Sequence, residues 1–257
     1  ALFYRSLAPW EQEHVADAYT FELGKCNHQD IQERMLWIIN QIDENLATKV
    51  ADGLGLKIPK KIEQPVNQAI GADADVEKFQ PQPKKDYLKK DNALSQAKTK
   101  FDSIATRQIA VLAADGFEME SFKPYKAALE KAGAVVKIVA PHGGSITCDQ
   151  DMEHKVAAAI MTTESVLFDA ILVPGGEKSV KSLLKKGKYA KFISEAFKHC
   201  KAIAVLGAGE ELLKESYIKN YTKDKAVFVD AKAQDFIDAI KQHRNWDRME
   251  TASSIPV

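Results

Sequence analysis

The sequence has little of what most directly marks a special site or compartment. It contains only three cysteines, Cys26, Cys148 and Cys200, far apart and without the paired spacing of a zinc site or a disulfide framework. No apolar run approaches membrane-spanning length, and the N-terminus lacks the charged start and long apolar core of a signal peptide. The sequence therefore predicts neither a metal site nor a membrane protein, and it leaves the compartment open.

Charge of one sign is also missing. The 36 basic and 36 acidic residues balance to a net charge of zero, so long-range attraction to nucleic acid or to an anionic membrane has no support. An initiator methionine is absent, and Ala1 is followed at once by an apolar stretch. We expect a soluble chain of one or two domains that has been cut from something longer.

The first part, residues 1–58, is predicted to be helical. Pro9 starts a pattern of helical spacing that ends at Gly24, and Asp30 is a candidate N-cap for a second apolar stripe that reaches Ile42. A third helix is expected from Glu44 to Leu54, before Gly55. Isolated helices of this length are marginal, so their apolar faces must pack on each other or on another part of a longer chain.

Residues 59–103 have the composition of a linker. Prolines interrupt a stretch rich in Lys, Gln, Asp and Asn, and its length exceeds that of a normal loop, so it either wraps over a neighbour or moves freely. Its lysines alternate with Asp86 and Asp91 and have no aromatic platform, which favours a solvated linker over nucleic-acid binding. These lysines are Lys84, Lys85, Lys89 and Lys90.

From residue 104 to 257 the pattern alternates strand and helix, which predicts an α/β fold with a doubly wound parallel sheet covered by helices on both faces. The stretch from Ser145 to Ala159 is mixed and favours a small hairpin or an edge insertion. Strands are expected at 109–113, 135–140, 170–173, 202–205 and 226–229, and helices at 119–132, 179–184, 190–199 and 231–243.

The stretch from Ile203 to Glu210 predicts the corner around which this domain is organised. A short apolar run turns abruptly at Gly207 and Gly209 and continues as a helix-forming stretch. In an open α/β sheet such a corner projects one side chain over the carboxyl ends of the strands, where these folds place their chemistry. Glycine occupies that position here, so the scaffold is present and its reactive position is empty.

Two other glycine turns follow buried strands. The turn at Asp115–Glu118 lacks the repeated glycines of a dinucleotide fingerprint or a P-loop, and Glu118 and Glu120 would repel phosphate at a helix N-terminus. Pro174-Gly175-Gly176 is explained by a backbone that turns tightly beside the corner and has no room for a Cβ. Nucleotide binding is therefore disfavoured.

The motifs Val111–Glu120, Asp169–Gly176 and Ala202–Gly209 resemble the DJ-1/PfpI superfamily, which includes the Hsp31 chaperones and the type I glutamine amidotransferase-like domains. The resemblance implies a flavodoxin-like domain in which the glutamate at Glu120 supports a reactive cysteine. This sequence retains Glu120 but has Gly207 at the cysteine position. The vestigial pocket implied by the resemblance consists of Glu120, Gly175, Gly176, Gly207 and Ala208.

Glycine supplies neither a thiolate nor an alkoxide, so nucleophilic catalysis at the corner is excluded. Cys200 is expected to be a small buried residue across a strand from the corner. Neither it nor Cys148 is expected to replace the missing nucleophile. Glu120 then acts either as a first-turn carboxylate that complements the helix dipole or as a surviving acid, and the first role is favoured.

The stretch from Ser6 to Leu56 resembles the helical segment near the end of the haem-domain region of catalases. Its matching residues include Pro9, Glu11-Gln12, His14 and Phe21–Lys25. In catalases the haem pocket comes from an earlier β-barrel region, so His14 and His28 are expected to be exposed helical residues rather than haem ligands.

A catalase helical segment, a polar linker and a DJ-1/PfpI-like domain in this order resemble the large-subunit catalases of fungi and bacteria. The resemblance implies a haem-dependent homotetrameric parent, cytoplasmic or secreted, that converts hydrogen peroxide to water and oxygen. This chain would contain no haem and be inactive alone. It would serve as a stabilising domain, next to the haem domain, that also binds unfolding client proteins without ATP. The alternatives are a residual glyoxalase or amidase and a small-molecule binding module.

Overall fold

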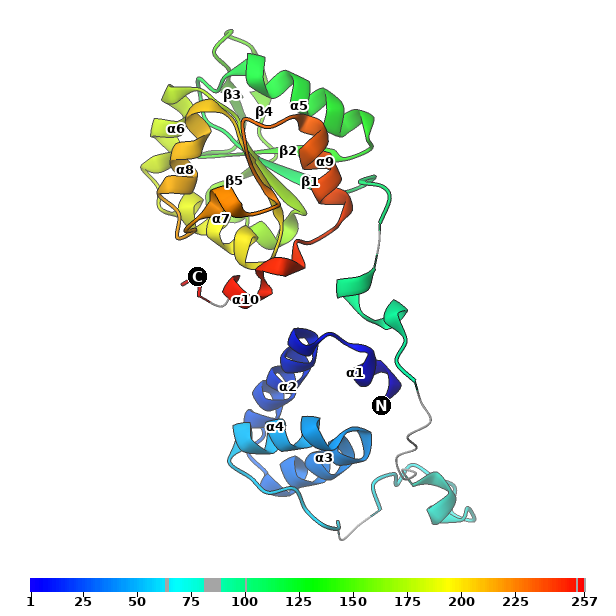
Figure 1. Ribbon diagram of the computed structural model, residues 1–257. Coiled ribbons are helices and arrows are strands. Elements are labelled where there is room, and N and C mark those ends of the chain that lie inside the picture. The colour runs from blue at the N-terminus through cyan, green and yellow to red at the C-terminus, as the bar shows by residue number, and fades with distance from the viewer. Residues whose placement is uncertain (63–64, 81–88, 100, 253, 257) are drawn as a thin grey trace. The chain divides into compact units, whose positions relative to one another are not determined.

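A computed structural model of the protein describes residues 1–62, 65–80, 89–99, 101–252 and 254–256 (Figure 1). The chain divides into two compact units, Ala1–Thr99 and Lys100–Val257. Each unit has its own buried core. The finer division into a helical segment, a linker and an α/β domain stays a prediction.

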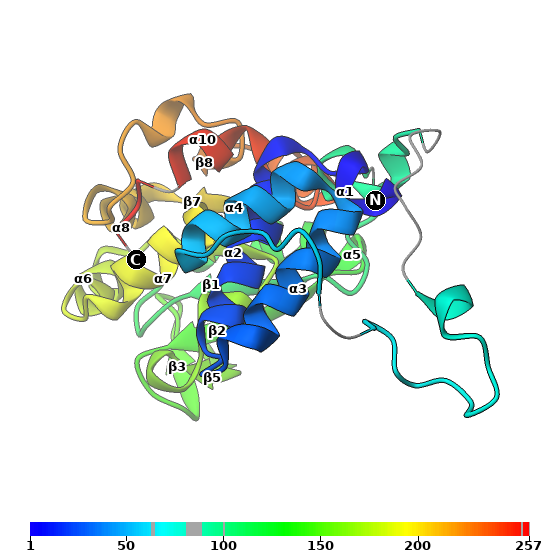
Figure 2. The same ribbon diagram turned by 90° about the horizontal axis from the view of Figure 1, so that it is seen from below.

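The described residues of the first unit form the α-helices α1 (Leu2–Ser6), α2 (Pro9–Gly24), α3 (Gln29–Ile42) and α4 (Glu44–Leu54). Helices α2, α3 and α4 lie side by side in both views, and α4 packs against the other two (Figure 2). Leu36, Ile39, Leu46 and Val50 are almost fully buried between them. The three expected helices are confirmed, whereas α1 was not predicted.

The helix caps differ from the sequence prediction. Asp30 lies inside the first turn of α3, and the residue that precedes the helix is His28, which makes no side-chain capping bond. The predicted N-cap at Asp30 is therefore wrong, although an acidic side chain in the first turn still complements the helix dipole. Asp43 caps α4 instead, because its carboxylate accepts from the amides of Asn45 and Leu46.

Part of the predicted linker folds onto the first unit. Residues 91–99 form two short 3₁₀ turns, η2 (Asn92–Leu94) and η3 (Gln96–Lys98), and the intervening Ser95 is completely buried. A third 3₁₀ turn, η1 (Val76–Phe79), lies earlier in the predicted linker. The lysines Lys89 and Lys90 are exposed, whereas Lys84 and Lys85 lie outside the described residues.

The second unit contains a six-stranded sheet in which every neighbouring pair is parallel. The spatial order is β5-β2-β1-β6-β7-β8. The strands are β1 (Gln108–Leu112), β2 (Val135–Ala140), β5 (Ala158–Ala159), β6 (Ala170–Val173), β7 (Ala202–Val205) and β8 (Val227–Val229). The predicted parallel α/β sheet is confirmed, with strand ends displaced by a residue or two.

Helices cover both faces of this sheet (Figure 1). Helices α5 (Met119–Lys131) and α9 (Ala233–Lys241) bury Phe122, Leu129 and Phe236 against one face. Helices α6 (Glu177–Leu184), α7 (Lys188–Lys198) and α8 (Glu210–Lys214) bury Leu183 and Phe192 against the other. A short helix, α10 (Met249–Ala252), follows α9 and was not predicted.

The mixed stretch at 145–159 forms both the small hairpin and the edge insertion that the sequence left as alternatives. Strands β3 (Ser145–Thr147) and β4 (Glu153–Lys155) pair as an antiparallel hairpin, and β5 then joins the edge of the main sheet. None of the helices within the described ranges is long and apolar enough to cross a membrane.

Candidate functional site

Three turns meet at the carboxyl edge of the sheet, after β1, β6 and β7. The turn after β6 lies directly against the turn after β1, since the amide of Glu118 donates to the carbonyl of Gly175 over 2.9 Å. Gly176 has φ +103°, and a Cβ added there would lie 2.5 Å from the carbonyl oxygen of Gly116. This close approach of two backbones explains why the β6 turn consists of glycines.

The corner after β7 has the predicted geometry. Gly207 lies in the left-handed region with φ +48° and opens a 3₁₀ turn, η6 (Gly207–Gly209), that leads into α8. Its amide donates to the carboxylate of Asp230 over 2.6 Å. A Cβ added at Gly207 would contact only the Cα of Gly175, at 3.9 Å. The corner therefore has room for a side chain at the position where a nucleophile would stand, and it carries none.

Glu118, rather than Glu120, has its carboxylate at this corner. A carboxylate oxygen of Glu118 lies 2.6 Å from the position that a Cβ on Gly175 would occupy. Glu120 is exposed in the first turn of α5, which is the favoured of its two predicted roles. The resemblance implies Glu120 as the acid of the pocket, but residues two apart at a helix start face different directions, and only the tertiary fold decides which of them faces the corner.

The Glu118 carboxylate is half-buried, and within the described part of the chain it makes no hydrogen bond or ion pair. Ala208, the residue after the corner, is also half-buried. The corner thus combines one unpaired acid, Asp230 bound to the backbone, and glycine surfaces. Such an arrangement can accept hydrogen bonds, but the corner position itself supplies no thiol or hydroxyl to attack a substrate.

Both thiols of this unit are buried, and neither stands at the corner position. Cys200 is fully buried at the C-terminal end of α7, and Cys148 is 3% exposed beside the backbone of Phe117. Burial raises the pKa of the Cys200 thiol to about 11. Because the thiolate is the nucleophilic form, Cys200 is inert at neutral pH.

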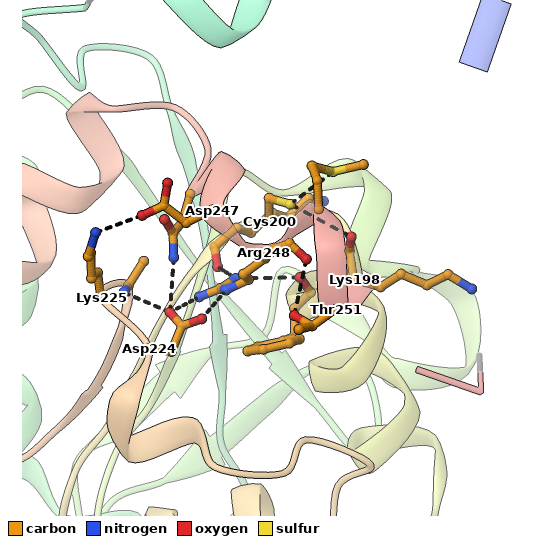
Figure 3. Close-up of polar contacts among 12 residues, drawn as sticks. Lys198, Cys200, Asp224, Lys225, Asp247, Arg248 and Thr251 are labelled. Atoms are coloured by element: carbon orange, nitrogen blue, oxygen red, sulfur yellow. Dashed lines mark hydrogen bonds and ion pairs between the residues drawn. The ribbon is translucent and has the colours of Figure 1, made fainter. Parts of the chain in front are cut away.

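A buried ion pair that the sequence did not indicate connects the region after α9 to the rest of the unit (Figure 3). Arg248 is 2% exposed, and two of its nitrogens donate to the two oxygens of Asp224, each over 2.7 Å. Its guanidinium also lies 4.2 Å from the centre of the Phe197 ring. No local pattern marks this pair, because its members are 24 residues apart and lie in polar stretches.

Residues 105–250 match the model of the C-terminal domain found in long catalases. The chain belongs to that family. Residues 1–54 match a second model, described as catalase-related immune-responsive. The C-terminal region of a long catalase, predicted from the order of the motifs, is thereby confirmed.

Several catalases are similar to this chain over nearly its whole length. It is 34% identical to Catalase HPII of Mycobacterium avium, over 98% of this chain and 35% of that protein. It is 32% identical to Catalase-2 of Bacillus subtilis, over 96% of this chain and 33% of the relative. For Catalase-1 of Neurospora crassa the identity is 26% over 96% of this chain and 35% of the relative. The chain spans about a third of the length of these curated relatives.

The two histidines that the sequence raised as possible haem ligands lie at the surface of the first unit. Both histidines of the catalase-like helices, His14 and His28, are exposed, and His14 packs edge-on against Trp10. A haem ligand needs a pocket that encloses the ring on both faces. Within the described ranges no group of three His, Cys, Asp or Glu side chains could hold a metal ion.

Proposed function

We propose that this chain is a non-catalytic stabilising region of a long catalase. In this proposal the complete protein is a haem-dependent homotetramer that decomposes hydrogen peroxide to water and oxygen, and its haem site lies outside this chain. The support comes from relatives named catalases that match nearly all of this chain yet are about three times its length. The observation that carries the non-catalytic role is the corner at Gly207, which has room for a side chain and carries none.

We infer a finer relationship to the DJ-1/PfpI superfamily and its Hsp31-like members. With the two-residue edge strand β5 left out, the order β2-β1-β6-β7-β8 corresponds to the flavodoxin-like order 2-1-3-4-5. The corner after β7 and the acid after β1 support the same inference. The vestigial pocket in this proposal contains Gly175, Gly176, Gly207 and Ala208, and Glu118 is its acid. Glu120 is exposed in the first turn of α5.

The alternative is a residual glyoxalase or amidase, or a small-molecule binding module, at the same corner. The unpaired Glu118 carboxylate favours the binding of a small molecule at the corner, because such an acid accepts hydrogen bonds from hydroxyl or amine groups. The enzymatic version is disfavoured, since the two thiols of this unit are buried and glycine supplies no nucleophile.

The proposal about haem is tested by titrating the purified chain with haem and recording the Soret band and the oxygen evolved from peroxide. We expect a spectrum of unbound haem and no oxygen above that from haem alone. A stoichiometric shift of the Soret band with rapid peroxide consumption would overturn the proposal.

We further propose that the isolated chain slows the aggregation of unfolding client proteins without ATP. Apolar side chains that remain exposed recruit other apolar surfaces. In the second unit Val166 and Leu167 are 73% and 61% exposed on one 3₁₀ turn, and in the first unit Phe21 is 66% exposed on α2. Three other aromatic side chains of the first unit, Trp10, Tyr19 and Trp37, are half-buried, as is Ile38.

Light scattering from a heated, unrelated enzyme tests this second proposal. The Val166→Ser/Leu167→Ser double variant and the Phe21→Ser variant separate the two units as sources of protection. Loss of protection in the double variant alone would assign the activity to the catalase C-terminal domain. Loss in Phe21→Ser alone would assign it to the helices, and no protection by the unmodified chain would overturn the proposal.

A further inference from the structure

A cavity of about 730 Å³ lies beside residues 254–256, and none of the residues of the β7 corner lines it. Its lining comes from three places: the end of α7, the loop between α8 and β8, and the C-terminal stretch with Thr251, Ser254, Ile255 and Pro256. Pockets for small molecules usually have volumes of about 300–1,000 Å³. The cavity is therefore large enough for a compact organic ligand.

The wall of this cavity is held in place by the buried ion pair of Figure 3. Asp224, the acidic residue in the lining, has both oxygens occupied by Arg248, and it also accepts from the Ala226 amide and the Asn245 side chain. Burial alone would raise the pKa of Asp224, but Arg248 outweighs this effect and holds that pKa below its usual value. Asp224 is thus a neutralised part of the wall.

Two lysines give the cavity its net charge. Lys219 and Lys223 both line it, because Asn220 between them takes a left-handed conformation, φ +56°, and starts the turn η7 (Tyr221–Lys223). In the described part of the chain neither lysine has a carboxylate partner. Two ammonium groups beside a neutralised acid leave a positive site.

Three hydroxyl groups in the lining are already engaged in hydrogen bonds, so that Tyr217 and Asn220 supply the neutral donors of the cavity and the two lysines supply its charged donors. Ser216 donates to the carbonyl of Leu213, Thr251 to that of Arg248, and Ser254 to that of Thr251. Each hydroxyl has one hydrogen, so none remains for a ligand while these bonds hold. Phe197 and Ile255 add buried apolar surface to the lining.

We propose that this cavity binds a small organic anion. The carboxylate or phosphate oxygens of the ligand accept from Lys219 and Lys223, and its apolar body lies against Phe197 and Ile255. This inference does not rest on the proposed catalase function, since it concerns a separate surface of the same domain.

An NMR titration of the full chain with two aromatic anions tests the proposal. Phenyl phosphate and benzoate represent the two anionic groups, and benzyl alcohol and benzylamine are the neutral and cationic counterparts. We expect at least one anion to shift the amide signals of residues 216–224 and of Thr251, Ser254 and Ile255 in a saturable way, and the alcohol and the amine to shift neither group of signals. Equal shifts from all four compounds, or none from either anion, would overturn the proposal.

The variants Lys219→Gln and Lys223→Gln should each raise the dissociation constant of the bound anion about fivefold, because each removes one ion pair of about 1 kcal/mol. Both lysines are exposed, so the fold should tolerate the change. Lys123→Gln, at an exposed position on α5, is the matched control and should leave the dissociation constant unchanged. An equal effect of all three variants would reduce the binding to general charge attraction and contradict the proposal.

Discussion

Gly176 and Gly207 both have positive φ angles, but they differ in what surrounds them. A Cβ on Gly176 would collide with the backbone of the β1 turn, whereas a Cβ on Gly207 would make one ordinary van der Waals contact, with the Cα of Gly175. We therefore expect Gly207→Ala to cost about 1 kcal/mol, the penalty of the left-handed conformation alone. Gly176→Ala should cost about 3 kcal/mol or more, because strain and overpacking add.

Urea unfolding of the two variants measures this difference directly. The larger loss of unfolding free energy should belong to Gly176→Ala. If Gly207→Ala were the more damaging change, the space described at the corner would not exist, and the interpretation of the corner as an emptied reactive position would be wrong.

Lys201 gives a prediction about pH. Its side chain is 2% exposed and donates to the carbonyl of Ser165, and burial, aided by the charge of Arg244, lowers the pKa of its ammonium to about 8. The unfolded chain keeps this proton up to the usual lysine pKa, so folding releases a proton between pH 8 and about 10.5. In this window the Lys201 contribution to unfolding free energy therefore increases with pH.

The measurement compares the unmodified chain with Lys201→Met at pH 8 and pH 10. The free energy of unfolding of the unmodified chain should rise by about 2 kcal/mol relative to the variant. Parallel curves for the two proteins would show that the Lys201 pKa is not lowered in the folded state.

At the level of single residues, the sequence predicted the positions that depend on backbone geometry better than those that depend on distant contacts. Gly207 was identified because a strand-to-helix corner is a local pattern. Glu118 was not distinguished from Glu120, and the pairing of Arg248 with Asp224 was missed, because each depends on segments that only the tertiary fold brings together.

At the level of elements, apolar periodicity was sufficient for the long helices and the buried strands. It failed for α1 and α10, which have five and four residues, too few for a periodic pattern. It also classed residues 91–99 as linker, because their attachment to the first unit depends on polar contacts. Ser95 and Gln96 both donate to the carboxylate of Glu11 on α2, a link that polar composition cannot reveal.

This attachment is tested by Glu11→Gln. The Glu11 carboxylate is 8% exposed and accepts from the Ala8 amide, the Ser95 hydroxyl and the Gln96 amide. An amide side chain has only one acceptor oxygen, so at least one buried donor loses its partner, at a cost of about 1–3 kcal/mol. Hydrogen exchange at residues 91–99 should accelerate accordingly.

Glu22→Gln is the control, since Glu22 lies on the same helix and pairs only with the exposed Lys25 in the described structure. Its effect on the exchange of residues 91–99 should be negligible. Similar acceleration in both variants would mean that Glu11 acts through the charge of the helix rather than through the attachment.

At the level of the whole molecule, two units with separate cores make up a chain that matches catalases over almost all of its length but about a third of theirs. In our proposal the second unit keeps the sheet, the turns and an acid of a corner-type active site but has no side chain at the corner position. The central claim of this account is that this unit has no hydrolase or glyoxalase chemistry of its own.

The most direct measurement is the turnover of methylglyoxal and of small ester and amide substrates by the purified chain. We predict rates equal to those of buffer for the unmodified chain, for Glu118→Gln and for Glu120→Gln. Turnover above buffer that persists in the Cys148→Ala/Cys200→Ala double variant and disappears in either glutamate variant would contradict the claim, because it would show an acid at the corner working without the missing side chain.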